Sequence, residues 1–176
     1  MAEQPPPANP TANLTAVYRA RDLHAEGVWP WSTYARYGGV VFDGRDRVLL
    51  REPKNHYDGY HWTFPKGAPG PGEQPVDAAL REVWEETGHR AAVVGHVPGA
   101  FSGGFTVSVN CFYLMHPTDE PVDEAAMEAN GETWAVRWAT RHEAGLLIAR
   151  STNAGGRRRD LDTLAAAYEA HQRIRA

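Results

Sequence analysis

Cysteine is almost absent from this sequence, with Cys111 the only one among 176 residues. One cysteine excludes an intrachain disulfide, so stability must come from a buried core, and a reducing compartment is expected. Cys111 is interpreted as a small buried strand residue rather than a nucleophile. No apolar run approaches the roughly 18 residues that a membrane span requires, and Met1–Pro10 lacks the basic and apolar segments of a secretory signal. These absences predict a cytoplasmic protein without a membrane partner.

The sequence also has little excess of charge of one sign. It contains 18 lysines and arginines and 22 aspartates and glutamates, which give a formal net charge of −4. This balance argues against a nucleic-acid partner, since a mildly acidic protein binds polyanions only through local basic residues or metal ions. The length favours one domain. Prolines at positions 5, 6, 7 and 10 predict a flexible tail over residues 1–13, followed by a single domain over residues 14–176.

Apolar runs between turn residues predict a series of strands and helices. Strands are expected over residues 34–42, 47–51, 61–64, 91–97, 105–114 and 134–139, with the first two joined as a hairpin. Helices are expected over residues 75–87, 141–150 and 161–174. Pro75 and Gly88 bound the first helix, and the glycines and prolines from Gly67 to Gly72 predict a loop. The pattern predicts the α/β class, as an α/β/α sandwich with a mixed central sheet.

The first predicted helix has two unlike faces. At about 100° per residue, one side of the helix collects the carboxylates of Glu82, Glu85 and Glu86. The opposite arc is apolar and consists of Val76, Leu80, Val83 and Trp84. We expect this arc to pack on the sheet and the carboxylates to point away from it, with Ala78 and Ala79 leaving room for a substrate.

Three glutamates this close together repel one another, by about 0.2–0.5 kcal/mol per pair on an exposed helix. Arg81 can reach Glu85, but one guanidinium cannot neutralise three carboxylates. A hard divalent cation would offset the repulsion, and Mg²⁺ (or Mn²⁺) binds through a few carboxylates together with water and substrate phosphates. The helix is therefore a candidate metal site, whereas Glu85-Glu86 alone would equally suit a solvated acidic face.

The glutamates belong to a longer pattern. Gly67, Glu73 and the run Arg81-Glu82-Val83-Trp84-Glu85-Glu86-Thr87-Gly88 resemble the Nudix hydrolase signature in all seven of its fixed positions. His89 departs from it, because the family usually has an aliphatic residue there, and we expect this to affect local packing. The resemblance implies a Nudix-type α/β/α sandwich and a metal-dependent pyrophosphohydrolase that cleaves a phosphoanhydride bond in a nucleoside diphosphate-linked substrate.

The resemblance also implies roles for individual residues. Glu82, Glu85 and Glu86 would be metal ligands, together with the backbone carbonyl of Lys66 or Gly67. Arg81 and Glu73 would form a supporting pair that holds the helix against the loop. The general base differs among such enzymes, so Glu82 and a glutamate of residues 123–132 are both candidates. Glu132 is favoured there because it directly precedes a predicted strand, although a solvated acidic loop is the alternative for each of these glutamates.

Substrate contacts are predicted around the segment Trp62–Gly67, which resembles the same region of dinucleoside polyphosphate hydrolases. Lys66 would meet a phosphate oxygen. The loop from Arg51 to Trp62, with Arg51 and Tyr60 as candidates, suits contacts with a base and a phosphate, or equally a cover over the core. Arg157–Arg159 open the last predicted helix and indicate an anionic partner, such as a distal phosphate or another subunit, or a solvated turn capped by Asp160.

Several alternatives remain open at the level of sequence. The substrate would be a nucleotide-like small molecule such as a dinucleoside polyphosphate or a nucleoside triphosphate, with nucleotide sugars, ADP-ribose and RNA ends also open. A non-catalytic Nudix-like domain that senses nucleotides is the rival hypothesis, and the complete set of glutamates favours the enzyme. Trp29-Pro30-Trp31 indicates internal packing or a contact in a homodimer.

Overall fold

The computed structural model of this protein describes residues 34–103 and 108–176. The proline-rich tail, Trp29-Pro30-Trp31 and part of the strand expected over residues 105–114 lie outside these residues. The described elements are β1 Ala35–Val41, β2 Val48–Pro53, the 3-10 helix Lys54–Gly59, β3 Lys66–Gly67, α2 Pro75–Thr87, β4 Ala91–His96, β5 Phe101–Ser102, β6 Val109–Pro117, α3 Glu124–Asn130, β7 Thr133–Ala139, α4 Arg141–Ala149 and α5 Ala154–Arg175.

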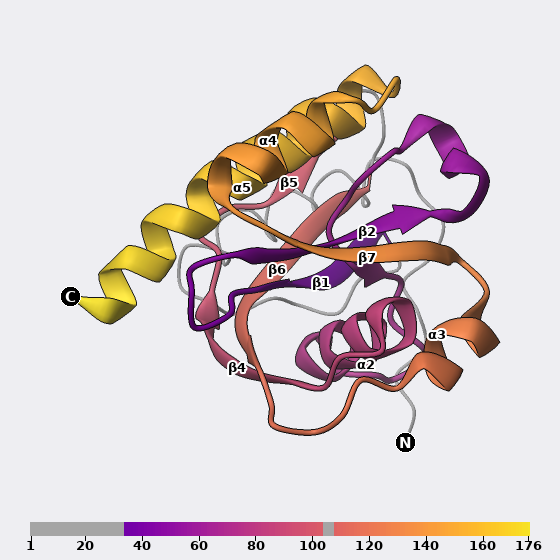
Figure 1. The fold of residues 1–176 in the computed structure, drawn as a ribbon, viewed down its shortest axis with the longest axis horizontal. Coiled ribbons are helices and arrows are strands. Elements are labelled where there is room, and N and C mark those ends of the chain that lie inside the picture. The colour runs from indigo at the N-terminus through magenta and orange to yellow at the C-terminus, as the bar shows by residue number, and fades with distance from the viewer. Residues whose placement is uncertain (1–33, 104–107) are drawn as a thin grey trace.

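The strands form two sheets between two layers of helices. Five strands make a sheet in the order β3-β1-β6-β4, with β5 beside β6, and β2 pairs with β7. The β1–β6 pair is parallel, whereas the other pairs are antiparallel. Figure 1 shows α2 and α3 on one side of the strands and α4 and α5 on the other. The predicted α/β/α sandwich with a mixed sheet is confirmed.

Side chains of β1 alternate between two cores, as the period of a strand requires. Tyr37 and Val41 belong to one buried cluster with Val83 of α2. Val40 and the following Phe42 belong to the other cluster, where the Phe42 ring meets Tyr168 of α5 edge-on at 5.0 Å between ring centroids. Each helical layer is therefore held to the sheet by its own core.

Cys111 lies in β6 and is buried on the α2 side of the sheet. Burial raises the pKa of its thiol, which disfavours the reactive thiolate. The interpretation of Cys111 as a buried strand residue is confirmed.

The predicted hairpin of the first two strands was wrong beyond its turn. Asp43 accepts hydrogen bonds from Arg45 and Arg47 in the turn, and Phe42 and Val48 form a single antiparallel bridge. After that bridge the strands diverge into different sheets, because both edges of β1 are occupied by β3 and β6.

Three further boundaries differ from the sequence predictions. Residues 61–64 form no strand, because only Thr63 pairs with Arg51, and the short strand β3 lies after Pro65 instead. The helices over residues 54–59 and 124–130 were not predicted. Helix α5 begins at Ala154 rather than Leu161, because the Asn153 side chain caps the Gly156 N–H at 2.8 Å.

Candidate functional site

Helix α2 has the predicted bounds but a different buried face. Pro75 occupies its first turn, and Gly88 ends it in the left-handed conformation at φ 71°. The buried residues of the helix include Ala78, Ala79, Glu82, Val83 and Glu86, whereas Val76, Leu80 and Trp84 are only partly buried. We expected the carboxylates to point away from the sheet, and this was wrong for Glu82 and Glu86 but not for Glu85. We also expected Ala78 and Ala79 to leave room for a substrate, and this was wrong because both are buried.

Small residues at the contact explain this orientation. A Cβ added to Gly39 of β1 would lie only 2.7 Å from Val83 Cγ2, so α2 approaches the strand closely. Trp84 instead covers α3, where its Nε1 donates to Asp123 at 3.2 Å. After the helix, the His89 ring packs edge-on against Trp138 at 5.5 Å between ring centroids. The close approach brings the carboxylates on the alanine side inward, toward β3.

Glu86 is the most enclosed of the three glutamates, with 1% of its surface exposed. Its Oε2 accepts a hydrogen bond from the backbone N–H of Lys66 at 2.8 Å, and its Oε1 lies 2.5 Å from Arg51 Nη2. Burial raises the pKa of Glu86 above its ordinary value, against the opposing effects of Arg51 and Lys66. Glu86 is thus a buried acid held in one orientation by two donors.

Glu82 lies directly over the backbone of Gly67. A Cβ at position 67 would overlap with the carboxylate carbon and both carboxylate oxygens of Glu82. Burial raises the pKa of Glu82, and a hydrogen bond from Arg81 opposes that effect. Because Gly67 has no side chain, the Glu82 carboxylate can lie against the backbone of β3.

Arg81 joins the helix to the loop that precedes it. Its Nη1 donates to Glu82 at 2.8 Å and to Glu85 at 2.9 Å. Its Nε and Nη2 each donate to Glu73 at 2.8 Å, and Glu73 in turn accepts from the Gly70 N–H at 2.7 Å. These bonds lower the pKa of Glu73 and raise that of Arg81. The expected contact between Arg81 and Glu73 is present and is bidentate.

The donor set fits a divalent cation in charge and chemistry. In residues 34–103 and 108–176, no three His, Cys, Asp or Glu side chains are gathered closely enough to hold a metal ion, and Arg81 lies between Glu82 and Glu85. The linked carboxylates are Glu73, Glu82, Glu85 and Glu86, against the guanidinium groups of Arg51 and Arg81. Two negative charges are in excess, and carboxylate and carbonyl oxygens are the ligands that Mg²⁺ prefers.

A cavity of about 730 Å³ opens beside these carboxylates, and Glu86 and Gly67 line it together with Arg51, Lys66 and Glu132. Arg51 Nη1 donates to the backbone carbonyl of Glu132 at 3.1 Å. The Glu132 side chain is exposed and lies near enough to Glu82 to raise its pKa. The volume is that of a small-molecule site.

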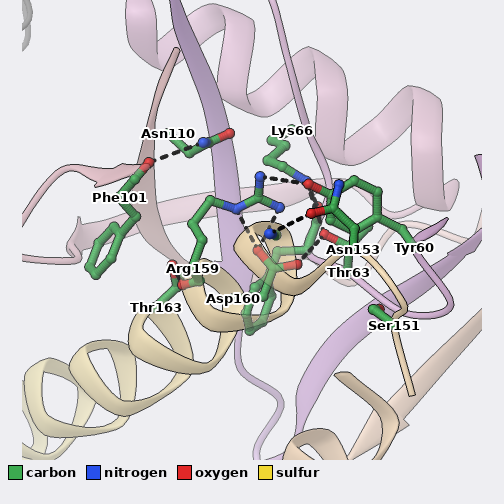
Figure 2. A network of polar contacts seen from close by, with 12 residues as sticks. Tyr60, Thr63, Lys66, Phe101, Asn110, Ser151, Asn153, Arg159, Asp160 and Thr163 are labelled. Carbon is green, nitrogen blue, oxygen red and sulfur yellow. Dashed lines mark hydrogen bonds and ion pairs between the residues drawn. The ribbon is translucent and has the colours of Figure 1, made fainter. Parts of the chain in front are cut away.

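Lys66 and Tyr60 lie on the same cavity wall (Figure 2). Lys66 Nζ donates to Thr63 Oγ1 at 2.9 Å and to the Phe64 carbonyl at 3.3 Å, and it lies 5.5 Å from the centre of the Tyr60 ring. Burial, followed by the charge of Arg159, lowers the pKa of Lys66. The Tyr60 hydroxyl accepts from Arg159 Nη1 at 3.1 Å, and burial raises its pKa.

Arg159 was predicted only as one of three arginines that indicate an anionic partner, and the interpretation of Asp160 as the cap of a solvated turn was wrong. Both residues are buried within α5, with Asp160 at 0% exposure. Only Arg158 of the three arginines is exposed. The missing signal was the helix start at Asn153, because a helix from there places Asp160 on the face of Leu164 and Tyr168 and Arg159 on the face of Thr163 and Ala167, all of which are buried.

Among the described helices, none combines the length and the apolar composition needed to cross a bilayer. The model of the NUDIX domain family matches residues 34–160. RNA pyrophosphohydrolase of Agrobacterium fabrum is 38% identical over 58 residues, which are 32% of this chain and 32% of that protein. Nudix hydrolase 3 of Caenorhabditis elegans is 35% identical over 104 residues, which are 55% of this chain and 42% of that protein. The chain thus spans less than half of either relative.

Solved structures show the same fold. A Caenorhabditis elegans Ap4A hydrolase in a binary complex is similar with a TM-score of 0.55 and 21% identity, over 78% of this chain and 98% of that one. At this level of identity the likeness concerns the fold alone.

Proposed function

This chain belongs to the NUDIX domain family, and from that premise we propose that it is a metal-dependent pyrophosphohydrolase acting on a nucleoside diphosphate-linked substrate. The observation that carries the proposal is the approach of Glu82 and Glu86 to the backbone of β3, where Glu86 lines a cavity that Arg51 and Lys66 also line. Acidic oxygens for a cation and basic groups for phosphate thus meet in one place.

Glu82, Glu85 and Glu86 would hold the Mg²⁺ (or Mn²⁺), together with the backbone carbonyl of Lys66 or Gly67. When bound, such a metal neutralises phosphate charge and lowers the pKa of bound water. Glu82 and Glu85 would then turn from Arg81 toward the cation, whereas Glu86 is already oriented by Lys66 and Arg51.

The remaining residues would orient the substrate and move a proton. Arg81 with Glu73 holds the loop against α2, and Arg51 and Lys66 would contact phosphate oxygens. Glu132 is exposed at the cavity edge beside Glu82, where it is our candidate to accept the proton of the attacking water. The name RNA pyrophosphohydrolase, carried by a relative that is 38% identical over 58 residues, supports cleavage of a pyrophosphate bond, and dinucleoside polyphosphates and nucleoside triphosphates are our candidate substrates.

A substrate panel tests this proposal. The full chain is incubated with Mg²⁺ or Mn²⁺ and with dinucleoside polyphosphates, nucleoside triphosphates, nucleotide sugars, ADP-ribose and triphosphorylated RNA, and the products are identified by mass in ¹⁸O-labelled water. We expect metal-dependent release of two phosphorylated products, with the label identifying the attacked phosphorus. Saturable binding of a nucleotide without products from any compound would replace the hydrolase with a sensing domain.

Gly67→Ala is expected to lower turnover by about tenfold to a hundredfold, because small displacements of catalytic groups have effects of that order. The added Cβ displaces the Glu82 carboxylate, and since that group ends a flexible side chain, the thermal midpoint should change little. Gly70→Ala is the matched control, because its Cβ would meet Glu73 only at an ordinary 3.5 Å. Turnover is compared for the two variants at saturating metal. Equal rates would exclude a role of Glu82 in the reaction.

A further inference from the structure

A buried guanidinium lies in the cavity wall apart from the glutamates of α2. Arg159 of α5 is 6% exposed and lines the same cavity as Glu86 and Lys66. Its Nε donates to Asp160 Oδ1 at 2.8 Å, and its Nη1 donates to the Tyr60 hydroxyl at 3.1 Å. Figure 2 shows this guanidinium between Asp160 and Tyr60, with Lys66 nearby. The group is held in place from its Nε edge.

Arg159 keeps donors that the described residues do not use. A guanidinium has five N–H groups. Its Nη2 is buried 2.8 Å from Asp160 Oδ1, as an ion-pair contact, and makes no hydrogen bond in the described part of the chain. The other oxygen of Asp160 accepts from Thr63 Oγ1 at 2.6 Å. Asp160 therefore faces both Nε and Nη2, and the second N–H of Nη1 is the donor left for a ligand.

Two glycines bring this part of α5 to the cavity. A Cβ at Gly156 would overlap with the Tyr60 ring and hydroxyl, and a Cβ at Gly155 would overlap with the Gly103 carbonyl. The first turn of α5 consequently packs directly on Tyr60. The Arg159 guanidinium carbon lies 5.2 Å from the centre of that ring.

Lys66 connects the two ends of the cavity. Its backbone N–H holds Glu86, whereas its ammonium group reaches back to Thr63 and to the ring of Tyr60. The hydrogen-bond partners of this ammonium group, Thr63 Oγ1 and the Phe64 carbonyl, are neutral, and Arg51, Lys66 and Arg159 all line the cavity that Glu86 also lines. The cations therefore continue beyond the glutamates, toward α5.

We propose that Arg159, with Lys66 and Tyr60, binds a substrate phosphate beyond the two that the cleaved bond joins, and so selects chains of three or more phosphates. The second N–H of Nη1 would donate to an oxygen of that phosphate while Asp160 fixes the plane of the guanidinium, a charge-assisted contact from a planar group that lysine does not reproduce. Nucleotide sugars and ADP-ribose, with two phosphates, would leave this position without a phosphate. The inference rests on the proposed function, because that function places the cleaved bond at α2.

Binding of inorganic tripolyphosphate to the full chain in EDTA tests the subsite without metal or turnover. By titration calorimetry, Arg159→Gln should bind about tenfold more weakly than the parent, because a charge-assisted contact is lost. Arg158→Gln is the matched control, since it removes the same charge from an exposed position of the same helix. Equal affinities of the two variants, or a parent that does not bind tripolyphosphate, would overturn the inference.

Arg159→Lys covers the case in which the glutamine variant fails to fold, because it keeps a positive charge opposite Asp160. We expect it to bind tripolyphosphate several-fold more weakly than the parent, and parent-like affinity would refute the subsite. With an active enzyme, kcat/KM should fall several-fold more for a triphosphate than for a diphosphate-linked substrate, mainly through KM. Equal losses on both would refute the subsite and leave the hydrolase in place, whereas a parent that binds tripolyphosphate but hydrolyses nothing would refute only the hydrolase.

Discussion

Glu86→Gln is expected to lower metal-dependent turnover by about a thousandfold, the upper range for losing one electrostatic contact in an active site. The amide keeps the shape of the side chain and can still accept from the Lys66 N–H. It loses the negative charge that a divalent cation requires, and it presents no carboxylate to Arg51, whose guanidinium is 2.5 Å away. The variant should therefore lack activity, and it should fold with a lower thermal midpoint because buried Arg51 loses its carboxylate partner.

The measurement is the initial rate at saturating Mg²⁺ with the best substrate of the panel, together with the circular dichroism spectrum and the thermal midpoint. Glu128→Gln is the matched control, because it makes the same change on the exposed side of α3. We expect the control to keep the parental rate. A parental rate in Glu86→Gln as well would exclude this side chain from the reaction.

Asp160→Asn is expected to lower the free energy of unfolding by about 3–5 kcal/mol, the cost of breaking a buried ion pair by removing one partner. Asp160 is fully buried, and among the described residues Arg159 forms an ion pair with no other carboxylate. An asparagine can still accept from Thr63, so the loss reports the unpaired charge of Arg159. Urea unfolding measures it, with the slope m held common to both proteins.

Asp162→Asn is the matched control, because Asp162 is exposed one half-turn away on the same helix, and it should change stability by less than about 0.5 kcal/mol. The double variant Arg159→Gln, Asp160→Asn removes both charges and should recover much of the loss, which a double-mutant cycle quantifies. A single variant as stable as Asp162→Asn would contradict the assignment of a buried ion pair.

Local signals account for what was predicted well from the sequence. Pro75 and Gly88 delimit α2 because they act on the backbone of the helix ends themselves. The same kind of signal was present but overlooked at α3, where Asp123 caps the Ala126 N–H and Gly131 ends the helix at φ 71°. It was also present at Asn153, which starts α5.

The buried face of α2 shows where reasoning from the helix alone failed. Hydrophobicity on a wheel favoured Val76, Leu80, Val83 and Trp84 as the packed side. Val83 is buried there as expected, but it shares the contact with Ala78 and Ala79, because Gly39 of β1 lets the helix come close. A pattern within one helix carries no information about the size of residues on the strand it meets.

The sequence by itself determined the types of the longer helices and strands, the extent of α2 and the membership in a family whose signature spans Gly67 to Gly88. Only the tertiary structure decided that Glu86 of α2 forms an ion pair with Arg51 of β2. It also decided that Arg159 donates a hydrogen bond to Tyr60, which lies 99 positions earlier in the chain. Caps, turns and signature spacings act over a few bonds, so they can be recognised in the chain. The charge and burial of a site depend on which distant segments pack together, and this is decided only when the two helical layers pack on the strands.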